Sequence, residues 1–287
     1  AGRRRRSRKN GFRPTTMTDR LRLRISPCPN DTFMFEALLN GRIPTQGLAF
    51  EVGFQDIEEL NEGVSSPDGP DISKISYAVL PAVVDRYALL DSGSALGRGN
   101  GQLLVRRGDR SPIRRVAIPG ELTTANAMLL RFFPSIVDRT PVLFSEIAAA
   151  VERGAFDAGV LIHEGRFTYE RHNLELVADL GALWERQTGL PLPLGGIVAS
   201  RELLAEVRRT FDRVLHDSIA YALEPPTVSR PFVREHAREL DDEVIDRHIA
   251  LFVNRYSLAL GEEGRRAVRE LTGLPDLRLG WEPLHGS

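Results

Sequence analysis

The hydrophobic positions of the chain fall into short blocks whose spacing predicts strands alternating with helices. Leu21–Ile25 alternates apolar and basic residues, which is the two-residue period of a strand. A continuous apolar run at 158–162, bounded by Asp157 and a glycine turn, predicts a short buried strand that delivers His163 at its carboxyl end. Apolar residues at the 3.6-residue period predict a long helix over 204–223, which Pro225-Pro226 ends.

The same patterns predict the other elements. Strands are expected at 48–52, 72–76, 102–105 and 116–118, and helices at 57–62, 84–90, 124–133, 145–153 and 244–258, the last closed by Gly261. The prolines in 190–194 require an extended chain, which feeds a further strand at 195–199. This alternation predicts an α/β protein with largely parallel sheets.

The first strand leads into a turn and a helix start. After Ser26-Pro27-Cys28-Pro29 come Asn30, Asp31 and Thr32, which are helix-capping residue types, and we expect the helix to cover 33–39. The segment 116–125 repeats this order of strand, turn and helix start. Free backbone N–H groups at a helix start suit an anionic ligand.

The two extended segments 102–105 and 192–199 bracket about ninety residues that carry their own strands and helices. We therefore expect two lobes joined by two connecting strands, with a central cleft between them. The expected boundaries are 17–107 with 195–287 for a discontinuous first lobe, and 108–194 for the second. Residues 1–16 form a leader outside both.

Charge is distributed unevenly. The chain of 287 residues has a formal net charge of −1, but residues 1–16 hold seven basic side chains and no acidic one, so the remainder carries −1 − 7 = −8. An acidic body argues against a nucleic-acid-binding surface. We expect the leader to be disordered and without a part in the chemistry, and Met17 is a candidate natural start.

Composition limits the class of protein further. The chain is 42% hydrophobic and 27% charged, typical of a soluble globular protein, and no run reaches the roughly 20 apolar residues of a membrane span. A single cysteine, Cys28, allows neither an intramolecular disulfide nor a thiolate zinc cluster. With no apolar leader near the start, a cytoplasmic location is expected.

Common cofactor motifs are missing from the sequence. No Gly-x-Gly-x-x-Gly opens a helix after the first strand, and no P-loop lysine pattern, HExxH or paired CxxC occurs. Their absence argues against metal and dinucleotide chemistry.

His163 is the first candidate, since imidazole titrates near working pH and takes a proton without a metal. The alternative is a structural residue at a strand end. Lys74, inside a short strand, is either a site residue or a solvated edge lysine. Cys28 has no basic neighbour in sequence to activate it, and its flanking prolines favour a rigid loop. His248 shares an apolar helix face, which favours a core histidine with a satisfied hydrogen bond.

Six segments in order resemble one family. They are SPCPNDTF (26–33), DISKIS (71–76), SGSALGRG (92–99), GELTTA (120–125), LIHEGRFTY (161–169) and TGLPLPLGG (188–196). Together they resemble the 1,4-dihydroxy-6-naphthoate synthases of the futalosine route to menaquinone, over about residues 21 to 265. The resemblance implies a two-lobed fold like that of the type II periplasmic solute-binding proteins. It also implies a cofactor-free lyase that converts cyclic dehypoxanthine futalosine to 1,4-dihydroxy-6-naphthoate and a dihydroxyacetone-type fragment.

The resemblance also implies residue roles. His163 corresponds to the family's proposed general base, and the substrate-contacting segments correspond to Lys74-Ile75-Ser76 and Thr124-Ala125. Asn30, Asp31 and Thr32, in the loop that matches the family's SPCPNDT segment, are expected less firmly to line the cleft. Arg98 and Arg166, each beside a glycine, are either cleft residues that steer a carboxylate or surface arginines. The expected partner is a small anionic substrate, without nucleic acid or membrane, and the sequence predicts no particular oligomeric state.

Two other functions fit the same architecture. One is the chorismate dehydratase of the same pathway, against which the SPCPNDT and LIHEGRFTY segments argue. The other is a non-catalytic module that binds a small carboxylate, because one fold serves several functions. The absence of a secretion signal and of a helix-turn-helix segment argues against this second class.

Overall fold

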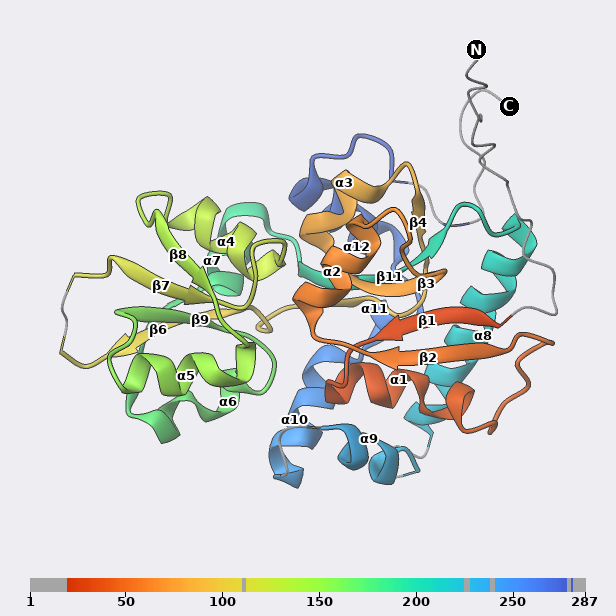
Figure 1. Ribbon diagram of the computed structural model, residues 1–287, viewed down its shortest axis with the longest axis horizontal. Helices are drawn as coiled ribbons and strands as arrows, with labels where there is room; N and C mark the ends of the chain where they lie inside the picture. Colours follow the sequence, from red (N-terminus) through yellow and green to blue (C-terminus); the bar gives the residue numbers. More distant parts are fainter. Residues whose placement is uncertain (1–19, 110–111, 225–227, 238–240, 278–279, 281–287) are drawn as a thin grey trace, which may run out of the picture.

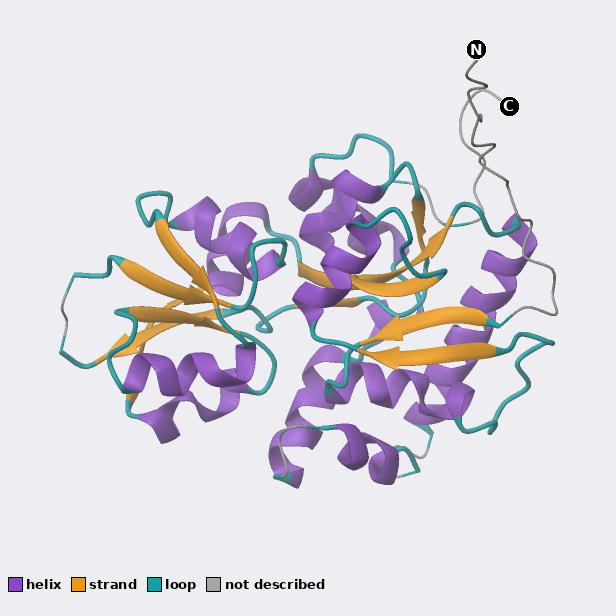
Figure 2. Ribbon diagram, viewed as in Figure 1, coloured by secondary structure: helices purple, strands orange, loops and turns teal. Residues whose placement is uncertain are grey.

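The computed structural model describes residues 20–109, 112–224, 228–237, 241–277 and 280. The basic leader and Met17 lie outside this range. Figure 1 shows two lobes side by side, each built on one sheet with helices on both faces, and Figure 2 shows the same layers by secondary structure.

The first lobe is built on a six-stranded mixed sheet. Its order is β2-β1-β3-β11-β4, and β5 also pairs with β11. The strands are β1 (Leu21–Ile25), β2 (Phe50–Phe54), β3 (Ile72–Ser76), β4 (Tyr87–Leu89), β5 (Ala95–Gly97) and β11 (Leu192–Ser200). The first three pair in parallel, whereas β11 runs antiparallel to β3, β4 and β5.

Helices cover both faces of this sheet. One face carries α1 (Pro29–Leu39), α8 (Ala205–Leu223), α9 (Arg230–His236) and α10 (Asp242–Phe252), which pack around α1. The other carries α2 (Ile57–Ser65), η1 (Tyr77–Val79), α3 (Leu80–Val83) and α12 (Gly261–Thr272), with α11 (Arg255–Leu258) near β5. Phe33, Phe35 and Phe211 are fully buried in the first of these layers.

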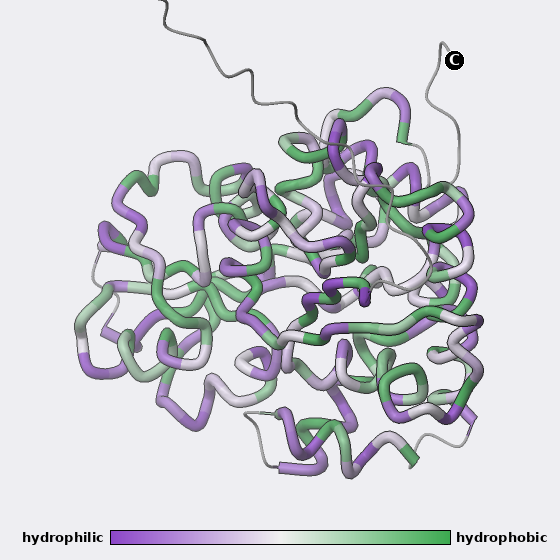
Figure 3. Tube along the Cα trace, turned by 45° about the vertical axis from the view of Figure 1, so that its right-hand side comes forward, coloured by the Kyte–Doolittle hydropathy of each residue, from purple (hydrophilic) through white to green (hydrophobic). Residues whose placement is uncertain are grey.

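The second lobe is built on a five-stranded mixed sheet, ordered β10-β6-β9-β7-β8. The strands are β6 (Leu103–Arg107), β7 (Arg115–Ile118), β8 (Asp138–Pro141), β9 (Ala158–Leu161) and β10 (Leu174–Asp179). One face carries α4 (Thr124–Phe132) and α7 (Leu180–Thr188), and the other carries α5 (Phe144–Glu152) with α6 (Gly165–Thr168) and η2 (Tyr169–His172). Hydrophobic stretches run through the interior of both lobes and hydrophilic ones follow outer turns (Figure 3).

The chain crosses between the sheets twice, once between β5 and β6 and once between α7 and β11. The boundaries expected from the sequence placed residues up to 107 in the first lobe and the return of the chain to that lobe at 195. In the structure β6 belongs to the second sheet and β11 starts at Leu192, so both crossings come a few residues earlier. The α/β fold with two lobes and two connecting segments agrees with the expectation, although the sheets are mixed and not largely parallel.

Some local predictions were wrong. The helix expected at 84–90 is a strand, β4, because Tyr87–Leu89 pairs with β11, whose partner residues are more than a hundred positions away. Gly261 begins α12 and does not close the preceding helix. The first helix starts at Pro29 with Cys28 as N-cap, so Asn30, Asp31 and Thr32 lie inside its first turn.

Candidate active site

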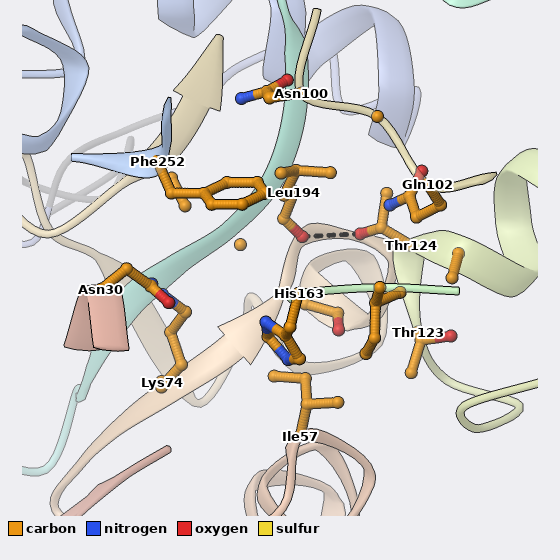
Figure 4. Close-up of a pocket in the computed structure, with 16 residues that line it drawn as sticks. Asn30, Ile57, Lys74, Asn100, Gln102, Thr123, Thr124, His163, Leu194 and Phe252 are labelled. Atoms are coloured by element: carbon orange, nitrogen blue, oxygen red, sulfur yellow. Dashed lines mark hydrogen bonds between the residues drawn. The ribbon is translucent and has the colours of Figure 1, made fainter. Parts of the chain in front are cut away.

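A pocket lies where the two lobes meet, enclosing about 610 Å³ of space between the atoms. Figure 4 shows its labelled side chains converging from both lobes. The first lobe contributes Asn30, Ile57, Lys74, Ser76, Ala95, Leu194, Gly195 and Phe252, the second Thr123, Thr124, Ala125, Ile162 and His163, and the crossing segment Asn100, Gly101 and Gln102. The lining is largely apolar with a few polar side chains, which is typical of sites for small organic molecules.

His163 enters the pocket from the second lobe just beyond β9. That strand is held between β6 and β7, and the chain turns sharply after it. His163 itself has φ of 51°, in the left-handed region that a residue with a Cβ seldom occupies. Such backbone strain costs roughly 1–3 kcal/mol and is concentrated at functional sites. The turn thereby aims the imidazole back towards the first lobe.

The His163 side chain is half-buried, and its Nε2 atom, which is buried, has no hydrogen-bond partner among the described residues. The Phe144 ring meets it edge-on at 4.9 Å between centroids, and the His248 ring stacks on it at 5.9 Å. Burial, followed by the positive charge of Lys74, lowers the pKa of His163 from 6.5 to about 3. The imidazole is therefore neutral at physiological pH, with a nitrogen able to accept a proton.

Lys74 stands in the middle of the first sheet, on β3, and is buried. Its Nζ atom donates to Asp31 Oδ1 at 2.7 Å, and the two side chains are 7% and 1% exposed. Asp31 also accepts from the Ser26 backbone N–H at 3.2 Å and from Asn30 Nδ2 at 2.9 Å. Of the two interpretations of Lys74, the solvated edge lysine is wrong, because β3 is an inner strand.

The opposite wall of the pocket is the start of helix α4. Thr123 is its N-cap and accepts from the Asn126 backbone N–H at 3.2 Å, so Thr124 and Ala125 occupy the first turn and line the pocket. Thr124 Oγ1 donates to the Leu194 carbonyl at 2.8 Å, which links the two lobes (Figure 4). The first-turn N–H groups and the helix dipole give this wall a positive character.

Contacts across the lobes hold the pocket walls together. The Leu122 backbone N–H, next to the α4 cap, donates to both carboxylate oxygens of Glu58 on α2, at 3.0 and 3.2 Å. Burial raises the pKa of Glu58 above its usual value. Ser76 accepts at Oγ from Asn61 Nδ2 at 3.0 Å, and Asn61 also donates to the Leu122 carbonyl at 3.4 Å. The structure therefore has its lobes in contact around the pocket.

Of the residues expected to contact substrate, five line the pocket together: His163, Lys74, Ser76, Thr124 and Ala125. Asn30, expected less firmly, lines it as well.

Five others do not line it. Ile75 is in the hydrophobic core, Asp31 is the ion partner of Lys74, and Thr32 Oγ1 donates to the Cys28 carbonyl at 3.1 Å. Arg98 is about half exposed and donates to the Gly189 carbonyl, where it ties the two crossing segments together. Arg166 pairs with Asp179 at 2.6 Å.

Several lining residues were not predicted from the sequence, among them Phe252, Leu194 and Gln102. Leu194 lies near the start of β11, Gln102 lies in the crossing segment before β6, and Phe252 ends α10, so only the assembled fold brings them to the site. The buried Gln102 Oε1 has no partner among the described residues. Cys28 is buried with Ser26 Oγ at 2.8 Å from its Sγ, and burial raises the pKa of its thiol, which leaves it protonated and unsuited to nucleophilic attack.

Comparisons with known proteins agree with this architecture. A family model described as menaquinone biosynthesis matches residues 21–275. A 1,4-dihydroxy-6-naphthoate synthase of Thermus thermophilus is 46% identical over 253 residues, which cover 88% of this chain and 92% of that protein. A crystal structure of an Archaeoglobus fulgidus protein is 34% identical, covers 88% of this chain and 95% of its own, and superposes with a TM-score of 0.81.

A Candida albicans protein described as having the generic periplasmic binding protein fold superposes with a TM-score of 0.67. It is 11% identical and covers 90% of this chain and 92% of its own, so it bears on the fold alone. The two mixed sheets and the paired crossings, together with this superposition, show that the chain has the periplasmic-binding-protein fold. The chain belongs to the 1,4-dihydroxy-6-naphthoate synthase family of menaquinone biosynthesis, and it is an enzyme. The family resemblance of the six segments is thus confirmed.

No helix in the part of the chain that the structure describes is long and apolar enough to cross a membrane.

Proposed function

We propose that the chain cleaves cyclic dehypoxanthine futalosine into 1,4-dihydroxy-6-naphthoate and a dihydroxyacetone-type fragment, with His163 as the general base. The observation that carries the proposal is the position of His163. A half-buried, neutral imidazole whose buried Nε2 has no partner among the described residues faces a pocket that also presents a lysine and a helix N-terminus.

In this reaction His163 takes a proton from the carbocycle of the substrate, beside the carbon–carbon bond that breaks. The electron pair of the C–H bond completes the second aromatic ring. The pair of the broken carbon–carbon bond leaves with the three-carbon fragment, which takes up the proton that His163 removed, so the imidazole is restored to its neutral form. The gain of an aromatic ring drives the reaction, and general-base assistance is typically worth about 10²–10⁴ in rate.

The low pKa of His163 makes it a weak base in the structure as described, and an anionic substrate changes this. Part of the depression comes from the Lys74 charge, so a carboxylate placed near Lys74 offsets that contribution and raises the pKa of the imidazole. The imidazolium formed during turnover is then stabilised by the negative charge that develops on the substrate.

The substrate carboxylate has two sources of stabilisation in the pocket. Lys74 offers a buried cation that already has one partner, Asp31, while the α4 start offers backbone N–H groups at Thr124 and Ala125. Helix N-termini bind carboxylates through these donors and the dipole. The side chains of Phe252, Leu194 and Ile57 supply apolar walls for the rings of the substrate.

Incubation of the chain with cyclic dehypoxanthine futalosine, followed by mass spectrometry, tests the proposed reaction. The expected result is 1,4-dihydroxy-6-naphthoate and one three-carbon product per turnover. Chorismate is the matched control substrate, because dehydration of chorismate is the rival reaction of the same pathway. Turnover of chorismate without turnover of the futalosine derivative contradicts the proposal, as does release of the futalosine derivative unchanged.

A further inference from the structure

The proposed base is held without a side-chain hydrogen bond to any described residue. Catalytic histidines are commonly oriented by a carboxylate or carbonyl that accepts from the second ring nitrogen. His163 instead lies between two aromatic rings. Phe144 belongs to its own lobe and meets it edge-on with an interplanar angle of 71°, whereas His248 belongs to the other lobe and stacks on it with an angle of 25°. Ring packing therefore sets the direction in which Nε2 points.

His248 is itself held firmly. It lies on α10, is fully buried, and contacts the Phe252 ring at 4.6 Å between centroids. Its Nε2 is 3.0 Å from Asn30 Oδ1. The Asn30 amide orientation follows from its other contact, because its Nδ2 donates to the Asp31 carboxylate, which only accepts. Asn30 Oδ1 is thus an acceptor, and His248 carries its proton on Nε2.

His248 is not suited to carry protons itself. Burial, followed by the charges of His163 and Lys74, lowers the pKa of His248 well below its usual value. Its Nε2–H is engaged with Asn30, and it does not line the pocket. His248 is therefore connected to the proposed reaction through its stacking on the His163 ring.

The stacking of His248 on His163 joins the two lobes, and α10 makes other contacts with the second lobe. The Arg247 guanidinium lies 4.6 Å from the centroid of the Phe167 ring of the second lobe. At the N-cap of α10, Asp241 pairs with Arg171 at 2.9 Å. The α10 helix is therefore a docking face for the loop and helices that follow His163.

We propose that His248 is a positioning residue for His163: its ring, anchored through Asn30, stacks on the base when the lobes close and fixes the direction of Nε2. This inference rests on the proposed function, since it assigns a support to the base named there. A displacement of about 1 Å at a reacting group costs on the order of 100-fold in rate, which sets the size of the expected effect.

The test compares His248→Leu with His248→Phe in the native chain. Both variants fill the site with apolar atoms and both leave Asn30 Oδ1 without its donor, so they differ in the ring alone. The expected result for the leucine variant is a kcat about 100-fold below native, with KM changed less than about threefold, since the substrate contacts remain. The kcat of the phenylalanine variant is expected to be at least about tenfold above that of the leucine variant, because a flat ring can still stack on His163.

His236→Leu is the matched control. Its ring packs on Phe54 and Phe232 of the first lobe, away from the pocket, and we expect native kcat and KM from it. Thermal unfolding of each variant checks that it is folded. If the leucine variant does not fold, the phenylalanine variant decides alone, and a kcat below about one-tenth of native contradicts the stacking role.

Equal kcat values for the leucine and phenylalanine variants overturn the inference, whether both are native-like or both are low. His163→Asn is measured beside them. A kcat near that of the native chain in His163→Asn overturns the base itself and with it the proposed function. A kcat lowered by about 100-fold or more in that variant, together with a native-like His248→Leu, overturns only the role of His248.

Discussion

Lys74→Met removes the cation from the buried ion pair and leaves Asp31 charged in a site where its side chain is 1% exposed. Methionine keeps the length and much of the volume of lysine, so the variant changes charge more than packing. Asp31 keeps the Ser26 N–H and the Asn30 amide as donors, but neither carries a charge.

The size of the effect follows from the geometry. Two unit charges 2.7 Å apart attract by about 6 kcal/mol at an effective dielectric constant of about 20. The cost of removing both ions from water cancels much of this attraction in the intact pair. When one partner is removed, the desolvation cost of the other ion is no longer offset, and proteins lose about 3–5 kcal/mol of stability when a buried pair is broken in this way. We expect Lys74→Met to lower the free energy of unfolding of the first lobe by this amount.

Urea denaturation followed by circular dichroism measures the effect, with Asp31→Asn and the double variant completing a cycle. The double variant is expected to be more stable than Lys74→Met, since no buried charge is left unpaired. A Lys74→Met variant within about 1 kcal/mol of native refutes the reasoning, because exposed pairs give losses of that size.

Three further predictions follow from other parts of the site. The pKa of His163 is about 3 in the folded protein and 6.5 in a free side chain, so between these pH values the unfolded chain binds more protons. The free energy of unfolding should therefore fall by up to about 5 kcal/mol as the pH drops from 6.5 to 3. The fall should be smaller in His163→Asn, and parallel curves for the two proteins contradict the burial of this ring nitrogen. Gly101→Ala places a Cβ 2.2 Å from backbone atoms of α7, so it should lower the free energy of unfolding by about 1–3 kcal/mol in thermal unfolding. Gly63→Ala is the control, because its Cβ meets nothing within 4 Å. Equal melting temperatures for the two variants are inconsistent with the close approach of Gly101 to α7. Glu58→Ala leaves the Leu122 N–H without its carboxylate acceptor and should raise KM about tenfold in steady-state kinetics. Glu58→Gln keeps an acceptor oxygen and should raise KM less. An unchanged KM in the alanine variant rules out this contact as a support of the pocket.

Much of the site could be predicted from sequence because its main residues follow short, strongly patterned segments. The strands β1 and β3 alternate apolar and polar residues, β9 is a continuous apolar run, and the cap and first turn of α4 contain threonines. Parallel strands such as β1 and β3 end at the same edge of their sheet, and the pocket lies where this edge meets the end of β9 in the other lobe. His163, Lys74 and Thr124 were predicted as site residues on these grounds and on the family resemblance.

The remainder depends on contacts between distant segments. Strand β4 exists because β11 supplies its hydrogen bonds, and no local pattern in 84–90 carries that information. Phe252 was recognised as an apolar helix residue, but its place in the pocket depends on how α10 packs against α1. His248 was predicted as a core histidine with a satisfied hydrogen bond; it has one at Nε2, while Nδ1 has no partner in the described part of the chain.

The most direct test of the central claim is the turnover of cyclic dehypoxanthine futalosine by His163→Asn, measured together with the affinity of the folded variant for the same compound. Asparagine keeps a polar side chain of similar reach but has no basic nitrogen. The account predicts native-like binding with naphthoate formation lowered by about 10²–10⁴, the usual worth of a general base. A kcat near that of the native chain contradicts the assignment of His163 as the base.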